Sequence, residues 1–299
     1  MTMIDTPIRL TPDLPCPFLR SERDRDFFDL EDGELIVASD RISVSGSVLP
    51  DAIPDKGRIL TRIAAFWFDA TRDIAPNHLV AADVRKFPEA LQAFRESLEG
   101  RSLLVEKIRP LPVGCTVHGC LAGRAYEELQ ATGSICGFRP SRRIKLAGLL
   151  PEPIFTPFLR TEDGQRRGIG MTELVDRVGV NLTRRLKDCS LSLYMRGYHL
   201  AWERGIILAD ARFEFGLKGN GSLVLVDEVL TPGASSYWAQ DQWKPGVVPH
   251  TIDQRRLQEH LATLSGREGI PPAPHLPEEV IEAIRASYLN LAARFGIRL

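Results

Sequence analysis

Apolar residues along the first half of the chain alternate between short continuous runs and wider, helical spacings. The run at 34–38 lies between polar turns and predicts a buried strand. Apolar residues then recur at three- and four-residue intervals over 59–67, which predicts an amphipathic helix, and 103–108 predicts another strand. The proline-rich passage 150–157 predicts an extended loop, because proline cannot donate a hydrogen bond to a sheet.

The second half of the chain has longer stretches with helical spacing and one strong hairpin pattern. An Asn-Gly turn at 218–221 separates two strand-like runs, which predicts a β-hairpin. The remaining elements expected here are a helix over about 172–204, strands at 205–215 and 222–230, and closing helices at about 252–264 and 277–295. Strands that precede helices in this way favour the α+β class over a doubly wound sheet.

Composition and net charge limit which partners the protein can bind and in which cellular compartment it is expected. The 299 residues are 43% hydrophobic and 26% charged, and the formal net charge is -1, which gives no electrostatic basis for binding nucleic acid or a membrane surface. No apolar run approaches the ~20 residues of a membrane span, and the first residues carry acids and prolines, unlike a secretion signal. Five scattered cysteines without a CxxC pair are typical of a reducing compartment, so we expect a cytoplasmic protein.

One cluster has the composition of a metal site but the wrong geometry. Cys115, His118 and Cys120 lie in a run that reads as a strand, where successive side chains point to opposite faces. Cys115 and His118 would then point apart, and the sequence offers no evident fourth ligand. We therefore expect no zinc site here.

The predicted hairpin carries the clearest candidate chemistry. Asp210 and Glu214 are four residues apart on one strand and so share a face, while Asp227 and Glu228 fall on the partner strand. Such carboxylates would repel one another unless Mg²⁺ or basic side chains neutralised them. The alternative is a set of exposed hairpin charges, and residue spacing alone leaves both interpretations open.

Several motifs in order along the chain resemble those of one enzyme family. The chain resembles the SAICAR synthetases, which are the phosphoribosylaminoimidazole-succinocarboxamide synthases of purine biosynthesis. The matching motifs are Ser-Asp-Arg-Ile-Ser at 39–43, Leu-Pro-Asp-Ala-Ile-Pro-Asp-Lys-Gly at 49–57, Leu-Pro-Glu-Pro-Ile-Phe-Thr-Pro at 150–157, Arg-Gly-Ile-Ile-Leu-Ala-Asp at 204–210 and Asp-Glu-Val-Leu-Thr-Pro at 227–232.

This resemblance implies an α+β fold with an ATP-type cleft between two lobes. The lobes would be an N-terminal antiparallel-sheet lobe at 1–112 and a larger C-terminal α+β lobe at 113–299 that includes the closing helices. Family members use ATP to activate a carboxylate of a ribonucleotide, through an acyl phosphate, for attack by the amine of aspartate. The resemblance also implies roles for particular residues. Implied catalytic residues are Asp210, Glu214 and His118; nucleotide-binding residues are Arg23, Lys56, Lys107 and Arg212; substrate-binding residues are Asp40, Arg41, Ser43, Arg124 and Ser236; and Mg²⁺ ligands are Glu214 and Asp227.

The departures from the family pattern fall at ligand-contact positions. A Gly-Lys pair that lies over the ATP phosphates in the family is matched by Glu22 and Arg23. A phosphate-binding arginine is matched by His118, and a nearby serine by Arg124. An Asp-Ser-Ser-Arg run is matched by 233–236, which reads Gly-Ala-Ser-Ser. Charge-assisted contacts are worth about 1.5–3 kcal/mol each, so their combined loss should weaken binding of the family substrate strongly.

The sequence alone therefore favours an altered function over authentic SAICAR synthesis. We expect an ATP- and Mg²⁺-dependent ligase that forms an amide on a non-purine small molecule in specialised metabolism, and the sequence allows a homo-oligomer. One alternative is an ATP-independent enzyme that performs a cyclisation, elimination or isomerisation without these cofactors. It is motivated by Glu22 and by Arg166 and Arg167, which match acidic family residues. A non-catalytic binding protein is the other alternative.

Overall fold

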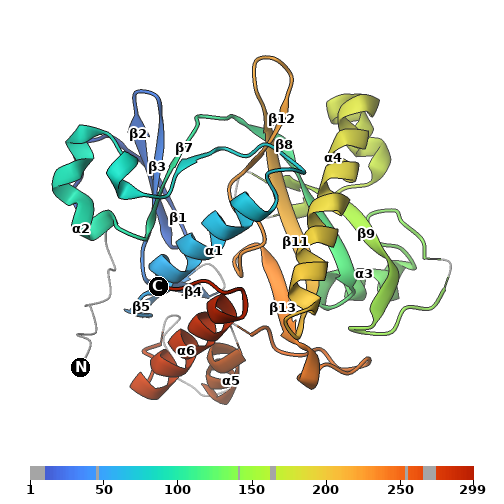
Figure 1. The fold of residues 1–299 in the computed structure, drawn as a ribbon. Coiled ribbons are helices and arrows are strands. Elements are labelled where there is room, and N and C mark those ends of the chain that lie inside the picture. Colours follow the sequence, from blue (N-terminus) through green and yellow to red (C-terminus); the bar gives the residue numbers. More distant parts are fainter. Residues whose placement is uncertain (1–10, 45–46, 141, 162–165, 253–254, 265–273) are drawn as a thin grey trace. The chain divides into compact units, whose positions relative to one another are not determined.

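The computed structural model describes residues 11–44, 47–140, 142–161, 166–252, 255–264 and 274–299. Contacts between residues divide the chain into two compact units (Figure 1). Unit 1 comprises 1–66, 78–107 and 252–299, and unit 2 comprises 67–77 and 108–251. The contacts group the closing helices with the N-terminal sheet, whereas the sequence interpretation grouped them with the C-terminal lobe.

Unit 1 is built on a five-stranded antiparallel sheet with the order β1-β2-β3-β7-β6. Its strands are β1 (Phe18–Glu22), β2 (Arg25–Leu30), β3 (Gly33–Ala38), β6 (Leu79–Ala81) and β7 (Ser102–Val105), and a separate two-stranded sheet contains β4 (Arg41–Val44) and β5 (Ser47–Ala52). The apolar run at 34–38 forms the buried central strand β3, as the pattern predicted. The second predicted strand ends earlier than expected, at Val105.

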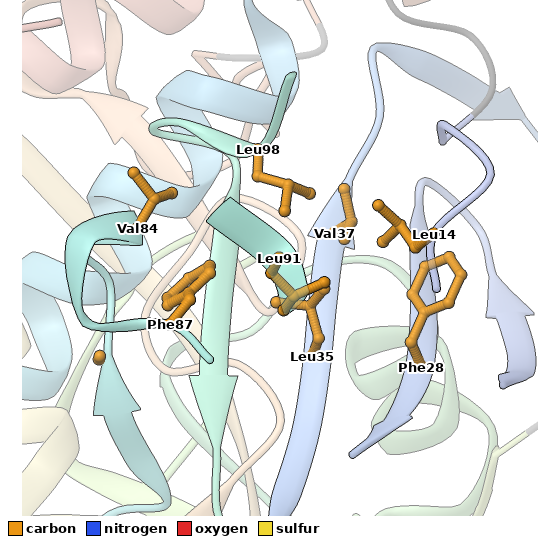
Figure 2. Close-up of a cluster of buried hydrophobic side chains, with 9 residues drawn as sticks. Leu14, Phe28, Leu35, Val37, Val84, Phe87, Leu91 and Leu98 are labelled. Carbon is orange, nitrogen blue, oxygen red and sulfur yellow. The ribbon is translucent and has the colours of Figure 1, made fainter. Parts of the chain in front are cut away.

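A hydrophobic core covers one face of this sheet (Figure 2). Leu35 and Val37 are two residues apart on β3 and fully buried, so they point to the same side of the strand. The other members are Leu14, Phe28, Ala81, Val84, Phe87, Leu91 and Leu98, several of which come from short helical turns. Those turns are the 3₁₀ helices η1 (Val84–Lys86) and η2 (Glu89–Phe94) and the helix α2 (Arg95–Leu98).

Three longer helices belong wholly or partly to unit 1. Helix α1 (Lys56–Ala70) contains the predicted amphipathic stretch, and Ile59 and Ile63, one turn apart, are fully buried. Its last residues, from Trp67 on, cluster with unit 2. The closing helices are α5 (Arg255–Leu264) and α6 (Glu278–Arg294), close to the ranges that periodicity predicted.

Unit 2 contains a six-stranded antiparallel sheet covered on one face by a long helix. The order along the sheet is β10-β9-β8-β11-β12, and β13 also pairs with β11. Figure 1 shows helix α4 (Met171–Trp202) running along this sheet. The other elements are β8 (Pro110–Cys120), α3 (Gly123–Thr132), β9 (Leu149–Arg160), β10 (Arg166–Gly168), β11 (Ile206–Leu217), β12 (Leu223–Val226), β13 (Ser235–Ala239) and the 3₁₀ helix η3 (Gln240–Gln242).

The proline-rich passage expected to be a loop is part of strand β9, which pairs with β8 and β10. Pro151 and Pro153 lie where the β8–β9 register shifts, between the pairs Cys120–Leu149 and His118–Ile154, and Pro157 pairs with Cys115. The carbonyl of Pro157 accepts from Ile169, on the side away from β8, so the ladder with β8 needs no donor from these prolines. The prediction failed because proline blocks only one side of a strand.

Two further expectations differ from the structure in detail. Helix α4 follows the predicted range but is interrupted at Gly179, whose φ of 80° and ψ of 160° are not helical. The second hairpin strand ends at Val226, so Asp227 and Glu228 follow it rather than lie on it. Asp227 has φ 64°, which turns the chain out of the ladder. Within the described residues, no helix is long and apolar enough to cross a bilayer.

Candidate active site

Three of the expected site residues lie side by side across the sheet of unit 2. Asp210 on β11 pairs with His118 on β8, and on its other side with Ser236 on β13. A register shift in the β11–β13 ladder lies between Leu208 and Asp210. Residues far apart in sequence thus form a row on three adjacent strands.

Strand β11 separates a polar face from a buried one. Asp210, Arg212 and Glu214 alternate with Ala211 and Phe213, and the latter two are fully buried. The buried face packs against α4, so the polar residues point to the opposite side of the sheet. Strand geometry therefore gathers the charged groups on the face that α4 does not cover.

His118 lies on the same face and is held by its neighbours. Its Nε2 atom is 2.9 Å from Oγ1 of Thr156 on β9. Burial lowers the pKa of His118 below 6.5, although the nearby Asp210 carboxylate opposes that shift. The imidazole is accordingly neutral at pH 7. Cys115 is buried on the other side of β8, as strand alternation predicted.

Glu214 and Asp227 form a carboxylate pair at the end of the β11–β12 ladder. Glu214 pairs with Val226, so Asp227 follows directly beside it. The guanidinium of Arg160 on β9 contacts both: its Nε is 3.1 Å from Oε1 of Glu214, and its Nη2 binds the same oxygen and lies 3.7 Å from Oδ2 of Asp227. Burial and the Asp227 charge raise the pKa of Glu214.

This pair suits a magnesium ion that also binds phosphate oxygens. Mg²⁺ is commonly held by one or two carboxylates, with substrate and water completing its octahedron. One guanidinium nitrogen between two carboxylates shows that their oxygens converge on a position for positive charge. The described residues contain no group of three or more acidic, histidine or cysteine ligands, so protein alone would supply two donors.

In the loop after β12, neighbouring residues position the Glu228 carboxylate. The hydroxyl of Thr231 donates to Oε2 of Glu228. A Cβ atom at Gly233 would lie 2.6 Å from the same oxygen, so a larger residue there would displace the carboxylate. Arg212 donates to the carbonyl of Gly233. The glycine that replaces the family aspartate thus fits the observed position of Glu228.

Arg124 occupies the first turn of helix α3 and is exposed. Gly123 opens this helix with φ 49°, and Ala122 at the N-cap has no side-chain oxygen to cap it. The first N–H groups of a helix carry partial positive charge, which Arg124 reinforces. This end of α3 is therefore suited to an anion.

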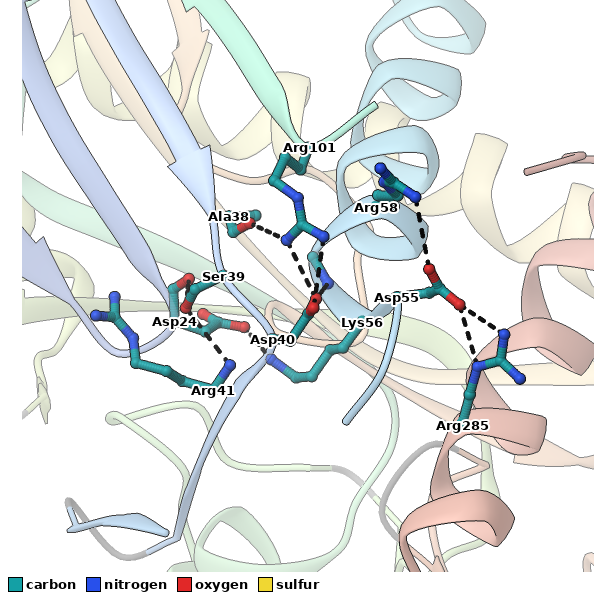
Figure 3. A network of polar contacts seen from close by, with 11 residues as sticks. Asp24, Ala38, Ser39, Asp40, Arg41, Asp55, Lys56, Arg58, Arg101 and Arg285 are labelled. Atoms are coloured by element: carbon teal, nitrogen blue, oxygen red, sulfur yellow. Dashed lines mark hydrogen bonds and ion pairs between the residues drawn. The ribbon is translucent and has the colours of Figure 1, made fainter. Parts of the chain in front are cut away.

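In unit 1, two of the residues expected at the substrate, Asp40 and Arg41, belong to a buried polar network (Figure 3). The Asp40 carboxylate accepts a hydrogen bond from the backbone N–H of Gly57 at 2.9 Å. Arg101 donates to its two oxygens at 3.2 and 3.4 Å. The side chain of Asp40 is 2% exposed. Asp40 therefore links the end of β3 to the first turn of α1, and its contact with a substrate stays a prediction.

Arg41 and Lys56 are likewise engaged within unit 1. Arg41 donates to Oδ1 of Asp26 at 2.6 Å. The ammonium of Lys56 binds the Asp24 carboxylate (Figure 3). Burial alone would raise the pKa of Asp24, but Lys56 holds it below its ordinary value. Asp24 follows the family's Gly-Lys position, so this chain supplies its own counter-ion to Lys56.

The other expected residues of unit 1 vary in their surroundings. Lys107 is exposed and pairs with Asp29 at 2.7 Å. Arg23 lies at the turn of the β1–β2 hairpin with φ 55°. The Oγ atom of Ser43 is buried and makes no hydrogen bond within the described part of the chain.

Sequence reasoning missed two residues of the polar face, Thr156 and Arg160. Both lie on β9, and they were overlooked because this stretch was interpreted as a loop. The even spacing of the two positions, on a strand, would have placed them on one face.

The matches to known proteins settle the family. The SAICAR synthetase family profile matches residues 21–270. A phosphoribosylaminoimidazole-succinocarboxamide synthase from Thermodesulfovibrio yellowstonii is 42% identical over 273 residues, covering 91% of this chain and 93% of the relative. The chain belongs to the SAICAR synthetase family. It is therefore an enzyme of a ligase family, and the predicted recognition and α+β fold are confirmed.

Solved structures agree with this assignment. A SAICAR synthase from Saccharomyces cerevisiae complexed with SAICAR has a TM-score of 0.87 and 29% identity, covering 97% of this chain and 99% of that one. A type-2 SAICAR synthetase in complex with ADP has a TM-score of 0.67 and 16% identity, covering 92% and 96%, and shares the fold.

The expectation of a non-purine substrate in specialised metabolism was wrong. Relatives about 40% identical over 90% of the chain carry the name of the purine-pathway synthase. The inference gave the lost contacts more weight than the motifs that the chain retains. It also did not consider Arg160, which lies on the strand that was interpreted in part as a loop.

Proposed function

We propose that this chain is a phosphoribosylaminoimidazole-succinocarboxamide synthase. The observation that carries the proposal is the 42% identity over 91% of the chain to a synthase of that name. The reaction joins the carboxylate of carboxyaminoimidazole ribotide to the amine of aspartate. The γ-phosphoryl group of ATP moves to the carboxylate oxygen, and the amine then attacks the carbonyl carbon and releases phosphate.

The polar face of unit 2 offers groups for each part of this reaction. Asp210 is proposed to accept the proton that the amine loses as the amide forms, with neutral His118 beside it. Arg124 and the first turn of α3 are proposed to bind the ribotide phosphate. Ser236, on the far side of Asp210, is a proposed substrate contact.

Glu214 and Asp227 are proposed to hold Mg²⁺, which would neutralise charge on the ATP phosphates. Arg212 lies between Asp210 and Glu214 on the same face and is proposed as a phosphate contact. Arg23, Lys56 and Lys107 are further proposed nucleotide contacts. For Lys56 this requires its ammonium to exchange Asp24 for phosphate.

A direct assay tests the proposal. The purified chain is incubated with carboxyaminoimidazole ribotide, aspartate and Mg-ATP, and both SAICAR and ADP are quantified by chromatography and mass spectrometry. We expect equimolar products, and loss of both with Asp210→Asn. Asp188→Asn, which changes an exposed carboxylate on α4, is the matched control and should retain activity. Failure of the folded wild-type chain to form SAICAR would refute the proposal.

A further inference from the structure

Arg160 lies at the end of β9 with its guanidinium between the two acidic residues of the proposed metal site. It forms two hydrogen bonds to one oxygen of Glu214 and an ion pair of 3.7 Å with Asp227. Its own side chain is 46% exposed, whereas those of Glu214 and Asp227 are 14% and 24% exposed. A half-exposed cation thus contacts two more enclosed anions.

The two carboxylates lie close together and share one counter-charge. Two negative charges this close repel each other, and the repulsion strengthens as water is excluded. Arg160 supplies the opposing positive charge through its contacts with both carboxylates.

The oxygen atoms that bind this guanidinium are those a metal ion would need. Oε1 of Glu214 receives two hydrogen bonds from Arg160, and Oδ2 of Asp227 faces the same nitrogen. A divalent cation close enough to coordinate these oxygens would lie within a few ångströms of the guanidinium carbon. Two cations at that distance repel strongly, so metal and guanidinium exclude each other.

We propose that Arg160 is a built-in counter-cation that competes with the divalent metal for Glu214 and Asp227 and so sets the metal affinity of the site. The inference rests on the proposed function, because that function assigns the metal to this pair. When the metal binds, the exposed Arg160 side chain moves off the carboxylates. Its charge then lies beside the site, where an anionic substrate group can accept its hydrogen bonds.

The test measures metal binding itself, without nucleotide or turnover. Mn²⁺ serves as the probe, and electron paramagnetic resonance counts the free ion in a titration of wild type and Arg160→Gln. We expect Arg160→Gln to bind Mn²⁺ about tenfold more tightly, since it removes both the competitor and its repulsion. Arg160→Lys retains the charge but cannot form both hydrogen bonds to Glu214. Its Mn²⁺ affinity should lie between those of wild type and Arg160→Gln.

Arg167→Gln is the matched control. Arg167 is on the neighbouring strand β10, is 53% exposed and pairs with Glu173 at 2.7 Å. Arg167→Gln changes the net charge of the protein as much as Arg160→Gln does. The comparison therefore separates the effect of Arg160 at the carboxylate pair from the effect of net charge. Its Mn²⁺ affinity should stay within about twofold of wild type.

Thermal unfolding gives a second readout if Arg160→Gln is destabilised. The variant leaves two carboxylates without their counter-ion, so Mg²⁺ should raise its Tm more than it raises that of wild type. Unchanged or weaker Mn²⁺ binding by folded Arg160→Gln would overturn the inference, even if the chain makes SAICAR. Tighter binding in a chain that makes no SAICAR would sustain the counter-cation role and reject the proposed function.

Discussion

Arg101 donates to both carboxylate oxygens of Asp40, and the two side chains are 3% and 2% exposed. The same guanidinium also donates to the carbonyl of Ala38 at 3.0 Å. Asp40 in turn accepts the N–H of Gly57 in the first turn of α1. A single buried ion pair thus joins a central strand to the start of a helix.

Removing one partner of this pair should be strongly destabilising. Asp40→Ala leaves the Arg101 guanidinium buried without its counter-ion, and we expect a loss of about 3–5 kcal/mol in the free energy of unfolding. Urea denaturation followed by circular dichroism measures it. Arg72→Gln, which breaks an ion pair whose side chains are 75% and 77% exposed, should have no measurable effect. Equal stability of both variants would contradict the structural role of Asp40.

Gly119 on β8 is packed too closely for any side chain. A Cβ atom there would lie 1.7 Å from Oη of Tyr194, which donates to the carbonyl of Leu208 at 2.7 Å. We expect Gly119→Ala to cost about 1–3 kcal/mol, because Tyr194 must move and lose that hydrogen bond. Gly219→Ala, where a Cβ meets nothing within 4 Å, is the control. Chemical denaturation measures the free energy of unfolding of both variants. If Gly119→Ala were as stable as wild type, the packing of Tyr194 against position 119 would be loose.

The depressed pKa of His118 predicts a contribution to acid sensitivity. Burial lowers this pKa below 6.5, so below about pH 6.5 the unfolded chain binds a proton that the folded chain does not. The free energy of unfolding should therefore fall as pH drops from 6.5 towards the folded pKa. The fall should be about 1.4 kcal/mol for each pH unit over which only the unfolded chain is protonated.

Denaturation at pH 7.5, 6.5 and 5.5 tests this for His118→Gln. The variant should lose less stability between pH 7.5 and 5.5 than wild type does, because glutamine does not titrate. His199→Gln, at an exposed position on α4, should retain the wild-type dependence. If His118→Gln lost more stability than wild type as the pH fell, the predicted direction of the His118 effect would be wrong.

Arg124 should matter for binding the ribotide if the proposed function holds. Arg124→Ala removes a charge-assisted contact, so the KM for the ribotide should rise roughly tenfold or more, with a smaller change in kcat. Steady-state kinetics at saturating ATP and aspartate measures this. Arg124→Lys should recover part of the affinity. Lys187→Ala removes an exposed positive charge on α4 and should leave the KM unchanged. If Arg124→Ala and Lys187→Ala changed the KM equally, Arg124 would not be part of the phosphate site.

Local pattern predicted most elements correctly but failed where pairing partners decide. Helices α1 and α6 followed from periodicity, since each buries one side of its own segment. Strand β3 followed from its continuous apolar run, which is buried on both faces. Strand β9 did not, because whether a proline disrupts a strand depends on which side has a neighbour. Likewise, the end of β12 at Val226 depends on the left-handed backbone of Asp227.

The candidate site shows the same division. The sequence indicated that Asp210 and Glu214 share a face of one strand, and they stay proposed site residues. It did not indicate that the Asp40 carboxylate is enclosed by Arg101 and Gly57 from distant parts of unit 1. It also overlooked Arg160, which meets Glu214 across 54 residues of sequence.

The sequence by itself determined the family, the order of the elements and the identity of the acidic residues on β11. Periodicity and motif order are properties of the linear chain, so they can be read without coordinates. The tertiary structure decided which charges neutralise one another, and so which carboxylates remain available for a ligand. Such pairing depends on distances of a few ångströms between strands, and no linear pattern encodes those distances.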